Sequence, residues 1–188
     1  MKKFILTILL AQLAVLGAMI WRWEQVVRNG VEFRVPCKAY DPRNPWRGRY
    51  LRSDIVADIT AVMNHVIVAP PAGRYESLPA GFVMVDRHST SNTPPLLVYK
   101  DEEPTMNPPF WFRVKRADCR NGKWTIDLPN TLYISERIAD NADKILSQSI
   151  STNIPNRAVA VFRAWKGDVT ITDIEIDGIP IEELADYP

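Results

Sequence analysis

The chain has 188 residues, with 23 basic and 22 acidic side chains and a formal net charge of +1. Leaving out Lys2, Lys3 and Arg22, which flank an N-terminal apolar segment, reduces the basic side chains to 20 against 22 acidic ones. A near-neutral domain of this kind is a poor candidate for binding nucleic acid, which requires clustered positive charge.

Residues 4–21, FILTILLAQLAVLGAMIW, contain no charged side chain. As a helix this segment would be about 27 Å long, close to the roughly 30 Å thickness of the hydrocarbon core of a bilayer. Trp21 and Trp23 suit the membrane–water boundary, where amphipathic rings lie at the level of the headgroups. The segment therefore indicates an uncleaved transmembrane signal anchor.

The alternative for this segment is a secretory signal peptide, whose apolar core usually has about 7–15 residues and ends in small residues. A cleavage-like site lies at Leu16-Gly17-Ala18, but more apolar residues follow it. For an anchor, the short N-terminus favours residues 1–3 in the cytoplasm and the rest of the chain on the extracytoplasmic, periplasmic side. Residues 22–30 would then form a juxtamembrane linker.

Residues 31–188 are expected to form one mainly β (α+β) domain, antiparallel and barrel-like or sandwich-like. Alternating apolar residues and turn signals predict its strands. These strands lie at residues 31–40, 50–60, 66–68, 82–85, 96–99, 110–115, 124–128, 159–165 and 169–176. Residues 50–60 are expected to return along 31–40 as a wide hairpin.

Two tight hairpins are predicted in the second half of the domain. Asn121-Gly122, between strands 110–115 and 124–128, readily takes the positive φ angles of a type I′ turn. Lys166-Gly167 separates the last two strands. In residues 169–176 the apolar positions change from odd to even, which predicts a one-residue β-bulge near Thr172-Asp173.

One segment follows the helical period instead. In residues 135–150, Ile138, Ala142, Ile145 and Leu146 recur at spacings of three and four, which predicts an amphipathic helix. Ser135 is a good N-cap for this helix, and Glu136 suits the positive end of its dipole.

The two cysteines, Cys37 and Cys119, are 82 positions apart. In an oxidising compartment they could form a disulfide bond, which would stabilise the domain by about 4 kcal/mol in the chain-entropy model. Two buried thiols are the alternative, because cysteine is often buried without pairing.

No residues with the spacing of a cofactor or metal site are present. His65 and His88 are isolated, whereas a zinc site needs three or four ligands. A serine–lysine dyad, such as Ser53 with Lys100 or Lys115, would form only through the fold. We expect no cofactor, and the sequence favours a non-enzymatic role.

The densest local cluster is DPRNPWRGRYLRSD, residues 41–54. It resembles the motif of the bacterial GDYXXLXY family, in which Gly-Asp-Tyr-x-x-Leu-x-Tyr follows an Asp-Pro-Arg-like turn. Gly48 and Tyr50 match this motif. The chain departs from it at Arg49, Ser53 and Ile55, where the family name has Asp, Leu and Tyr.

Other parts of the chain also resemble the family layout: the N-terminal anchor, the Tyr133-Ile134-Ser135-Glu136 start of a helix, and the final hairpin at Asp177-Gly178. The resemblance implies a protein of the bacterial inner membrane, of uncharacterised activity, often found beside a multi-span membrane protein. It transfers no catalytic residues.

The cluster at 41–54 has a structural and a functional interpretation. Prolines and Gly48 would stiffen a turn that ion pairs close. Alternatively, Trp46, Arg47 and Arg49 would form a protrusion that binds a partner, since Trp, Tyr and Arg dominate binding hot spots. The candidate motif or partner-binding residues are Asp41, Arg43, Trp46, Arg47, Gly48, Arg49, Tyr50, Tyr133 and Glu136.

The sequence thus favours a single-pass membrane-anchored binding or scaffolding protein that acts with a multi-span membrane partner. One alternative is a membrane-tethered hydrolase with a signal-peptidase-like β domain, which would place a serine hydroxyl beside a lysine amine in a cleft. Another is an envelope domain that captures a small ligand, which a substantial apolar pocket would suggest.

Overall fold

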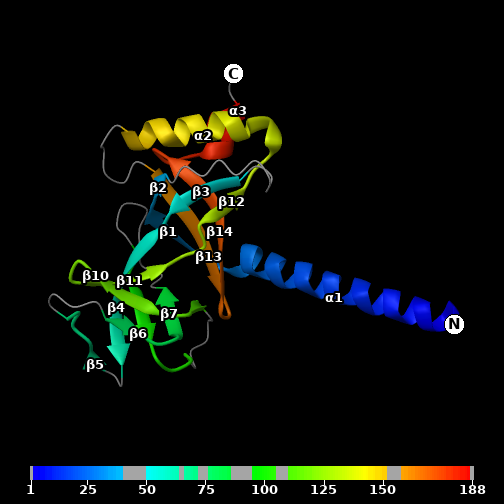
Figure 1. Ribbon diagram of the computed structural model, residues 1–188, viewed down its shortest axis with the longest axis horizontal. Helices are drawn as coiled ribbons and strands as arrows, with labels where there is room; N and C mark the ends of the chain where they lie inside the picture. The colour runs from blue at the N-terminus through cyan, green and yellow to red at the C-terminus, as the bar shows by residue number, and fades with distance from the viewer. Residues whose placement is uncertain are drawn as a thin grey trace.

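The computed structural model describes residues 2–39, 50–63, 66–71, 76–85, 95–104, 110–151 and 158–186. A long helix, α1 (Lys2–Asn29), projects from the side of a β-rich domain (Figure 1). Two further helices, α2 (Glu136–Ser151) and α3 (Ile181–Asp186), lie together at one end of this domain. The expected class, an N-terminal apolar helix followed by a mainly β domain, is confirmed.

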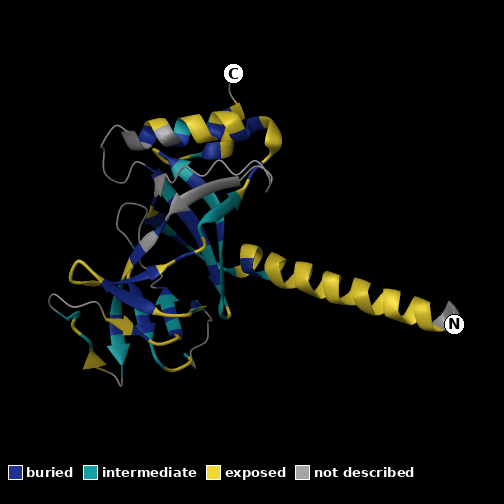
Figure 2. Cartoon of the chain, in the orientation of Figure 1, coloured by how far each residue is buried: buried dark blue, intermediate teal, exposed yellow. Residues whose placement is uncertain are grey.

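Helix α1 is long and apolar enough to cross a membrane: it has 26 residues from Phe4 to Asn29, and an 18-residue stretch of it has a mean hydropathy of 2.3. These properties fit a single-pass membrane anchor or a signal sequence. Figure 2 shows that nearly the whole helix is exposed. The helix continues to Asn29, so the stretch predicted as a linker is helical; Glu24 with Arg28 and Gln25 with Asn29 form i,i+4 contacts there.

The first sheet is antiparallel, with the strand order β1-β13-β14-β15. Its strands are β1 (Val31–Pro36), β13 (Ala158–Trp165), β14 (Asp168–Ile176) and β15 (Ile179–Pro180). The predicted two-residue turn between β13 and β14 is confirmed, because Lys166 and Gly167 have φ angles of 45° and 95°. The predicted bulge is confirmed as well.

At the bulge, Val161 pairs with Asp173 but Phe162 pairs with Ile171, so Thr172 is the extra residue. The Thr172 hydroxyl donates to the Val161 carbonyl at 3.2 Å. The extra residue turns Ile174 inward again after Ile171, and both side chains are buried.

The second sheet curls into a half barrel and has the order β6-β10-β11-β4-β8-β7-β9, with β5 paired to β4. Its strands are β4 (Val56–Met63), β5 (Val66–Ile67), β6 (Ser77–Leu78), β7 (Gly81–Val85), β8 (Leu97–Lys100), β9 (Trp111–Val114), β10 (Ala117–Arg120) and β11 (Lys123–Asp127). Strands β4 and β8 are parallel, which corrects the expectation of a wholly antiparallel domain.

The type I′ turn predicted at Asn121-Gly122 is confirmed, since both residues have positive φ. Its first strand was predicted wrongly. The turn joins β10 to β11, and β10 was not predicted as a strand of its own. The predicted strand at 110–115 corresponds to β9, which pairs with β7. Arg116, between β9 and β10, lies outside both strands, which allows them to take different partners.

A small third sheet has the order β12-β3-β2, with strands β2 (Lys38–Ala39), β3 (Tyr50–Asp54) and β12 (Thr131–Tyr133). The pairing of Lys38 with Asp54 and of Ala39 with Ser53 confirms only one end of the predicted wide hairpin. The remaining residues of the two stretches pair elsewhere, β1 with β13 and β4 with β11 and β8. The stretch predicted as one strand at residues 31–40 is divided at Cys37 between two sheets. Helix α2 contacts β2, β3, β13 and α3, and its predicted apolar stripe is confirmed by the burial of Ile138, Ala142 and Leu146.

The two larger sheets share one core. Phe33 on β1 stacks on Phe162 of β13, with ring centroids 5.3 Å apart. Phe33 also stacks on Phe112 of β9, with ring centroids 5.9 Å apart and an interplanar angle of 3°. All three rings are buried, so Phe33 is the aromatic link between the four-stranded sheet and the half barrel.

Replacing this link should therefore destabilise the whole domain. We expect Phe33→Ala to lower the free energy of unfolding by about 3–5 kcal/mol, because it leaves a cavity between two rings. Chemical denaturation of the full-length protein in detergent measures the effect. Val66→Ala, at an exposed position of β5, is the control and should stay within about 0.5 kcal/mol of wild type.

A second prediction concerns Asp173 beside the bulge. Burial raises the pKa of its carboxyl, and the charges of Glu182 and Glu175 raise it further, against the hydrogen bond that Ile174 N–H donates to it. The folded protein therefore binds this proton more tightly than the unfolded chain. As pH rises from about 4 through the raised pKa, the contribution of Asp173 to stability falls.

Asp173→Asn removes the charge and keeps an oxygen acceptor for Ile174. We expect the variant to gain stability relative to wild type between pH 4 and pH 7, as measured by thermal unfolding over that range. A constant difference between the two proteins at every pH would show that the charge of Asp173 carries no such penalty.

Candidate functional site

The predicted motif residues that the structure describes lie together. Tyr50, at the start of β3, is the register partner of Tyr133 at the end of β12, and Glu136 begins α2 three residues later. The Tyr133 side chain is 76% exposed. Asp41, Arg43, Trp46, Arg47, Gly48 and Arg49 lie outside the described residues, so their role as a partner-binding protrusion remains a prediction.

The two cysteines are buried thiols in the structure. Cys37 follows β1, and its backbone N–H donates to the Ala158 carbonyl at 3.0 Å. The thiol of Cys119, on β10, contacts the Pro71 carbonyl at 3.8 Å.

A groove with a volume of about 1050 Å³ lies between the four-stranded sheet and the half barrel. We call it the β1–β4 groove, after the strands that form much of its lining. The lining residues are Arg34 to Pro36 and Val159 from the first sheet, Ala57 to Ala61 from β4, Ile67 to Pro70, Pro95 to Leu97, and Gly122 to Trp124. No sequence motif predicted this groove, because its lining comes from six separate segments.

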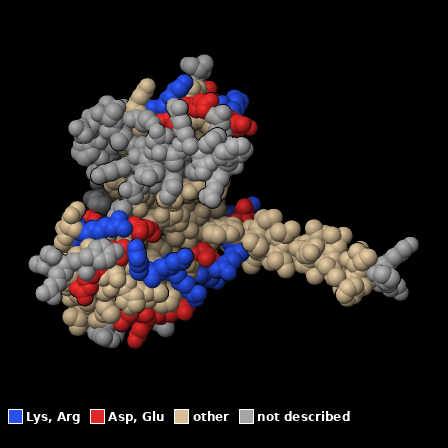
Figure 3. Space-filling view, viewed as in Figure 1, with Lys and Arg blue, Asp and Glu red and all other residues tan. Residues whose placement is uncertain are grey.

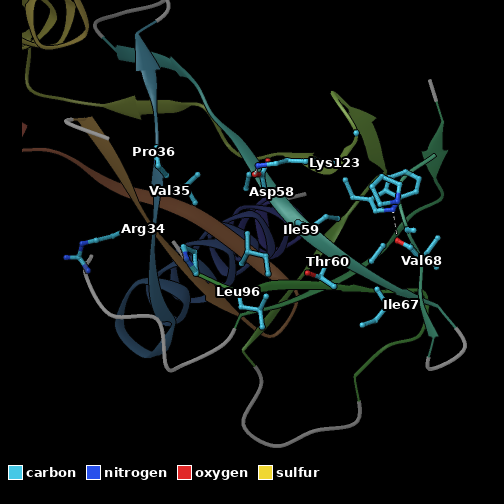
Figure 4. A pocket seen from close by; sticks show the side chains of 18 of the residues that line it. Arg34, Val35, Pro36, Asp58, Ile59, Thr60, Ile67, Val68, Leu96 and Lys123 are labelled. Carbon is cyan, nitrogen blue, oxygen red and sulfur yellow. Dashed lines mark hydrogen bonds and ion pairs between the residues drawn. The ribbon is translucent and has the colours of Figure 1, made fainter. Parts of the chain in front are cut away.

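Two hydrogen bonds hold one wall of the groove in place. The Trp124 indole Nε1 donates to the Val68 carbonyl at 2.9 Å, and the Val68 N–H donates to the Ala61 carbonyl at 2.8 Å. Figure 4 shows Val35 and Pro36 on one side and Ile67 and Val68 on the other, with Leu96 below. The segment after β5 is thus fixed against β4 from two directions.

The rim of the groove carries exposed hydrophobic side chains. Ile67 is 70% exposed and Leu96 is 51% exposed, and Val66, the neighbour of Ile67 on β5, is also exposed. The sequence predicts a strand at residues 66–68; in the structure, β5 is a two-residue edge strand that runs back along β4. Its apolar side chains therefore reach solvent rather than the core. This short apolar run before two prolines is the one local signal that marks the groove in the sequence.

Strand β1 contributes an open edge. Among the described strands, β13 is its sole partner. Because the N–H of Cys37 points to β13, alternation directs the backbone groups of Val35 toward β13 and those of Arg34 and Pro36 away from it. Arg34 and Pro36 both line the groove, so a backbone donor and two carbonyl acceptors lie on this open edge.

Ion pairs flank the apolar lining. Lys123 lies 2.6 Å from Asp58, and this hydrogen bond raises the pKa of the Lys123 amine. Arg34 forms two hydrogen bonds with the Glu175 carboxylate, at 3.0 and 3.1 Å, which raise the pKa of its guanidinium. Arg34 also pairs with Glu32 at 2.6 Å. These charges are neutralised within the domain, which leaves the apolar surface as the main feature of the groove.

The groove offers shape and apolar surface rather than reactive groups. Its lysine, Lys123, is paired with Asp58. In the part of the chain that the structure describes, no three His, Cys, Asp or Glu side chains gather closely enough to hold a metal ion. The arrangement suits binding of an apolar or extended ligand.

These features define a class of protein: a β-rich domain with an apolar groove, carried on one N-terminal helix of membrane-crossing length. The family model described as GDYXXLXY protein matches residues 12–174, from within α1 to β14. The chain therefore belongs to the GDYXXLXY family, which confirms the resemblance noted in its sequence. No curated protein and no solved structure is similar enough to match.

The Trp124–Val68 hydrogen bond provides a test of how the groove wall is held. Trp124→Phe should lower the free energy of unfolding by about 1–3 kcal/mol, since it removes the donor and leaves a small void. Hydrogen exchange of peptide 66–71 should become faster, while exchange of a β13 peptide stays unchanged. Equal acceleration in both peptides would indicate global destabilisation instead.

Proposed function

We propose that the protein is a single-pass membrane-anchored binding protein of the bacterial inner membrane. Its domain lies on the periplasmic side and captures an extended apolar segment of a multi-span membrane protein in the β1–β4 groove. The observation that carries the proposal is an apolar groove next to an open strand edge, with Ile67 and Leu96 exposed on its rim.

The length and composition of α1 support the anchoring. Lys2 and Lys3, directly before the apolar run, favour the cytoplasmic side for that end of α1, which would leave the domain outside the cytoplasm. An uncleaved α1 confines the groove to the vicinity of the bilayer, where segments of multi-span proteins emerge. Membership of the GDYXXLXY family fits this arrangement.

The open edge of β1 supports an extended ligand. A peptide that adds to a strand edge gains main-chain hydrogen bonds, and pockets for alternate side chains supply specificity. The outward backbone groups of Arg34 would pair with such a peptide, while Val35, Ile59 and Leu97 would contact its apolar side chains. The exposed rim residues fit an occupant that extends beyond the groove.

A second candidate function is capture of a small apolar envelope ligand. The groove volume of about 1050 Å³ favours it, because ligand sites usually measure about 300–1,000 Å³. The hydrolase alternative gains no comparable support, since the groove lysine, Lys123, is held by Asp58. A peptide and a small ligand would give different products in the same crosslinking experiment.

The test places a photo-crosslinking amino acid at Leu96 of the full-length protein in its native membranes. We expect crosslinks to a multi-span membrane protein, mapped by mass spectrometry to one extended segment of it. Ile67→Glu, on the opposite rim, should reduce this product about tenfold or more, equivalent to at least 1.4 kcal/mol of binding energy.

Ile179 provides the matched control. It is also an exposed apolar residue of a two-residue edge strand, but β15 belongs to the other end of the four-stranded sheet. Ile179→Glu should leave the crosslink unchanged. Crosslinks to lipid or another small molecule would favour the second candidate, and equal losses in both variants would contradict a role for the groove.

A further inference from the structure

Helix α1 is fixed to the domain at its C-terminal end. Arg22 forms two hydrogen bonds with the Asp168 carboxylate, at 2.7 and 2.9 Å. One turn further on, Val26 is buried, and Arg163 donates to the Val27 carbonyl. These contacts hold α1 at a set angle to the domain.

Gly30 allows the chain to pass directly from α1 into β1. A Cβ atom at this position would lie 2.4 Å from the Val26 carbonyl oxygen and 3.2 Å from that of Ala164. Both obstacles are backbone atoms, which cannot rotate away. The junction is therefore closely packed, without room for a flexible linker.

Asp168, which pairs with Arg22, belongs to the tip of the β13–β14 hairpin, residues 165–168. This tip is held from a second side by β9: the Gly167 N–H donates to the Trp111 carbonyl at 2.9 Å, and the Arg113 N–H donates to the Gly167 carbonyl at 3.0 Å. The tip therefore has a fixed position relative to α1 and to both large sheets.

Because Arg22 binds Asp168, the position of Arg22 in α1 determines how far the hairpin tip lies from the hydrocarbon core of the bilayer. Arg22 directly follows Trp21, the last residue of the uncharged segment, so the Asp168 carboxylate lies where the apolar part of α1 ends. From that point to Asn29 the helix rises only about 12 Å. The headgroup layer beside the hydrocarbon core is about 5–7 Å thick, so the hairpin tip would meet it.

The chemistry of the surface around the tip suits this layer. Lys166 is exposed, and its amine lies 5.5 Å from the centre of the Trp165 ring. Arg113, next to Gly167, has a side chain that is 67% exposed. Figure 3 shows Lys and Arg side chains, with some acidic ones among them, beside the base of α1. Amines and guanidinium groups bind phosphate oxygens, and tryptophan favours the interface.

We propose that the tip of the β13–β14 hairpin rests on phospholipid headgroups beside α1, and that this second contact holds the domain in one orientation on the membrane. The inference rests on the proposed retention of α1 in the bilayer. It adds a surface of the domain, with Lys166 at its centre, that binds the phosphate layer directly.

The experiment uses the full-length protein with a single environment-sensitive fluorophore on Lys166→Cys. Lys144→Cys, at an exposed position of α2, is the matched control, and the wild type measures any labelling of the two buried thiols. The proteins are reconstituted in vesicles of phosphatidylcholine and phosphatidylglycerol, with or without lipids that carry a quencher next to the headgroup. We expect the emission maximum of the label at Lys166→Cys to shift to the blue in vesicles, and the quencher lipids to remove most of its emission. The label at Lys144→Cys should show neither effect.

Asp168→Asn should reduce the quenching at Lys166→Cys, because it weakens the link to Arg22, while the protein stays resistant to alkaline carbonate extraction. Release of the wild type by carbonate would overturn the membrane anchoring in the proposed function. Retention of the protein with equal quenching at both labelled positions, or with none at Lys166→Cys, would overturn the headgroup contact alone.

Discussion

The turn of the β13–β14 hairpin is the point on which the arrangement of the whole molecule depends. Gly167 exchanges backbone hydrogen bonds with Trp111 and Arg113 of β9, and the next residue, Asp168, binds Arg22 of α1. Two sheets and the projecting helix are thus joined within two residues. The positive φ of Gly167, at 95°, and the 3.0 Å approach of Trp111 to its missing Cβ position explain why glycine is needed there.

This joint and the stack of Phe33 between Phe162 and Phe112 fix how the two large sheets face each other. The β1–β4 groove lies between these same sheets, so its width is set by buried contacts rather than by its own exposed residues. A rigid groove loses less conformational entropy on binding than a flexible one. The Trp124–Val68 hydrogen bond extends this rigidity to the wall that carries Ile67.

Features encoded within a few residues could be predicted from the sequence. The turn at Asn121-Gly122, the bulge at Thr172 and the apolar stripe of α2 each depend on local backbone geometry. Strand pairing could not be predicted in the same way, because period-two alternation tells which face is buried and not which strand lies alongside. The parallel β4–β8 pair and the groove both follow from such pairing.

Of the predicted motif, Tyr50, Tyr133 and Glu136 are brought together at the β3–β12–α2 junction, away from the groove.

An exposed apolar groove beside an open strand edge is also a risk, since such edges promote aggregation. The chain limits this risk locally. Pro36 removes one N–H from the open edge of β1, β5 has only two residues, and the Lys123–Asp58 pair puts charge beside the groove. In the proposed function, a tethered domain would tolerate these restrictions, because confinement near its partner would raise the effective concentration, and modest affinity would then be sufficient for occupancy. Under this proposal the helix and the groove would be linked by energetics: anchoring in the membrane would supply the proximity that a binding edge with few free donors requires.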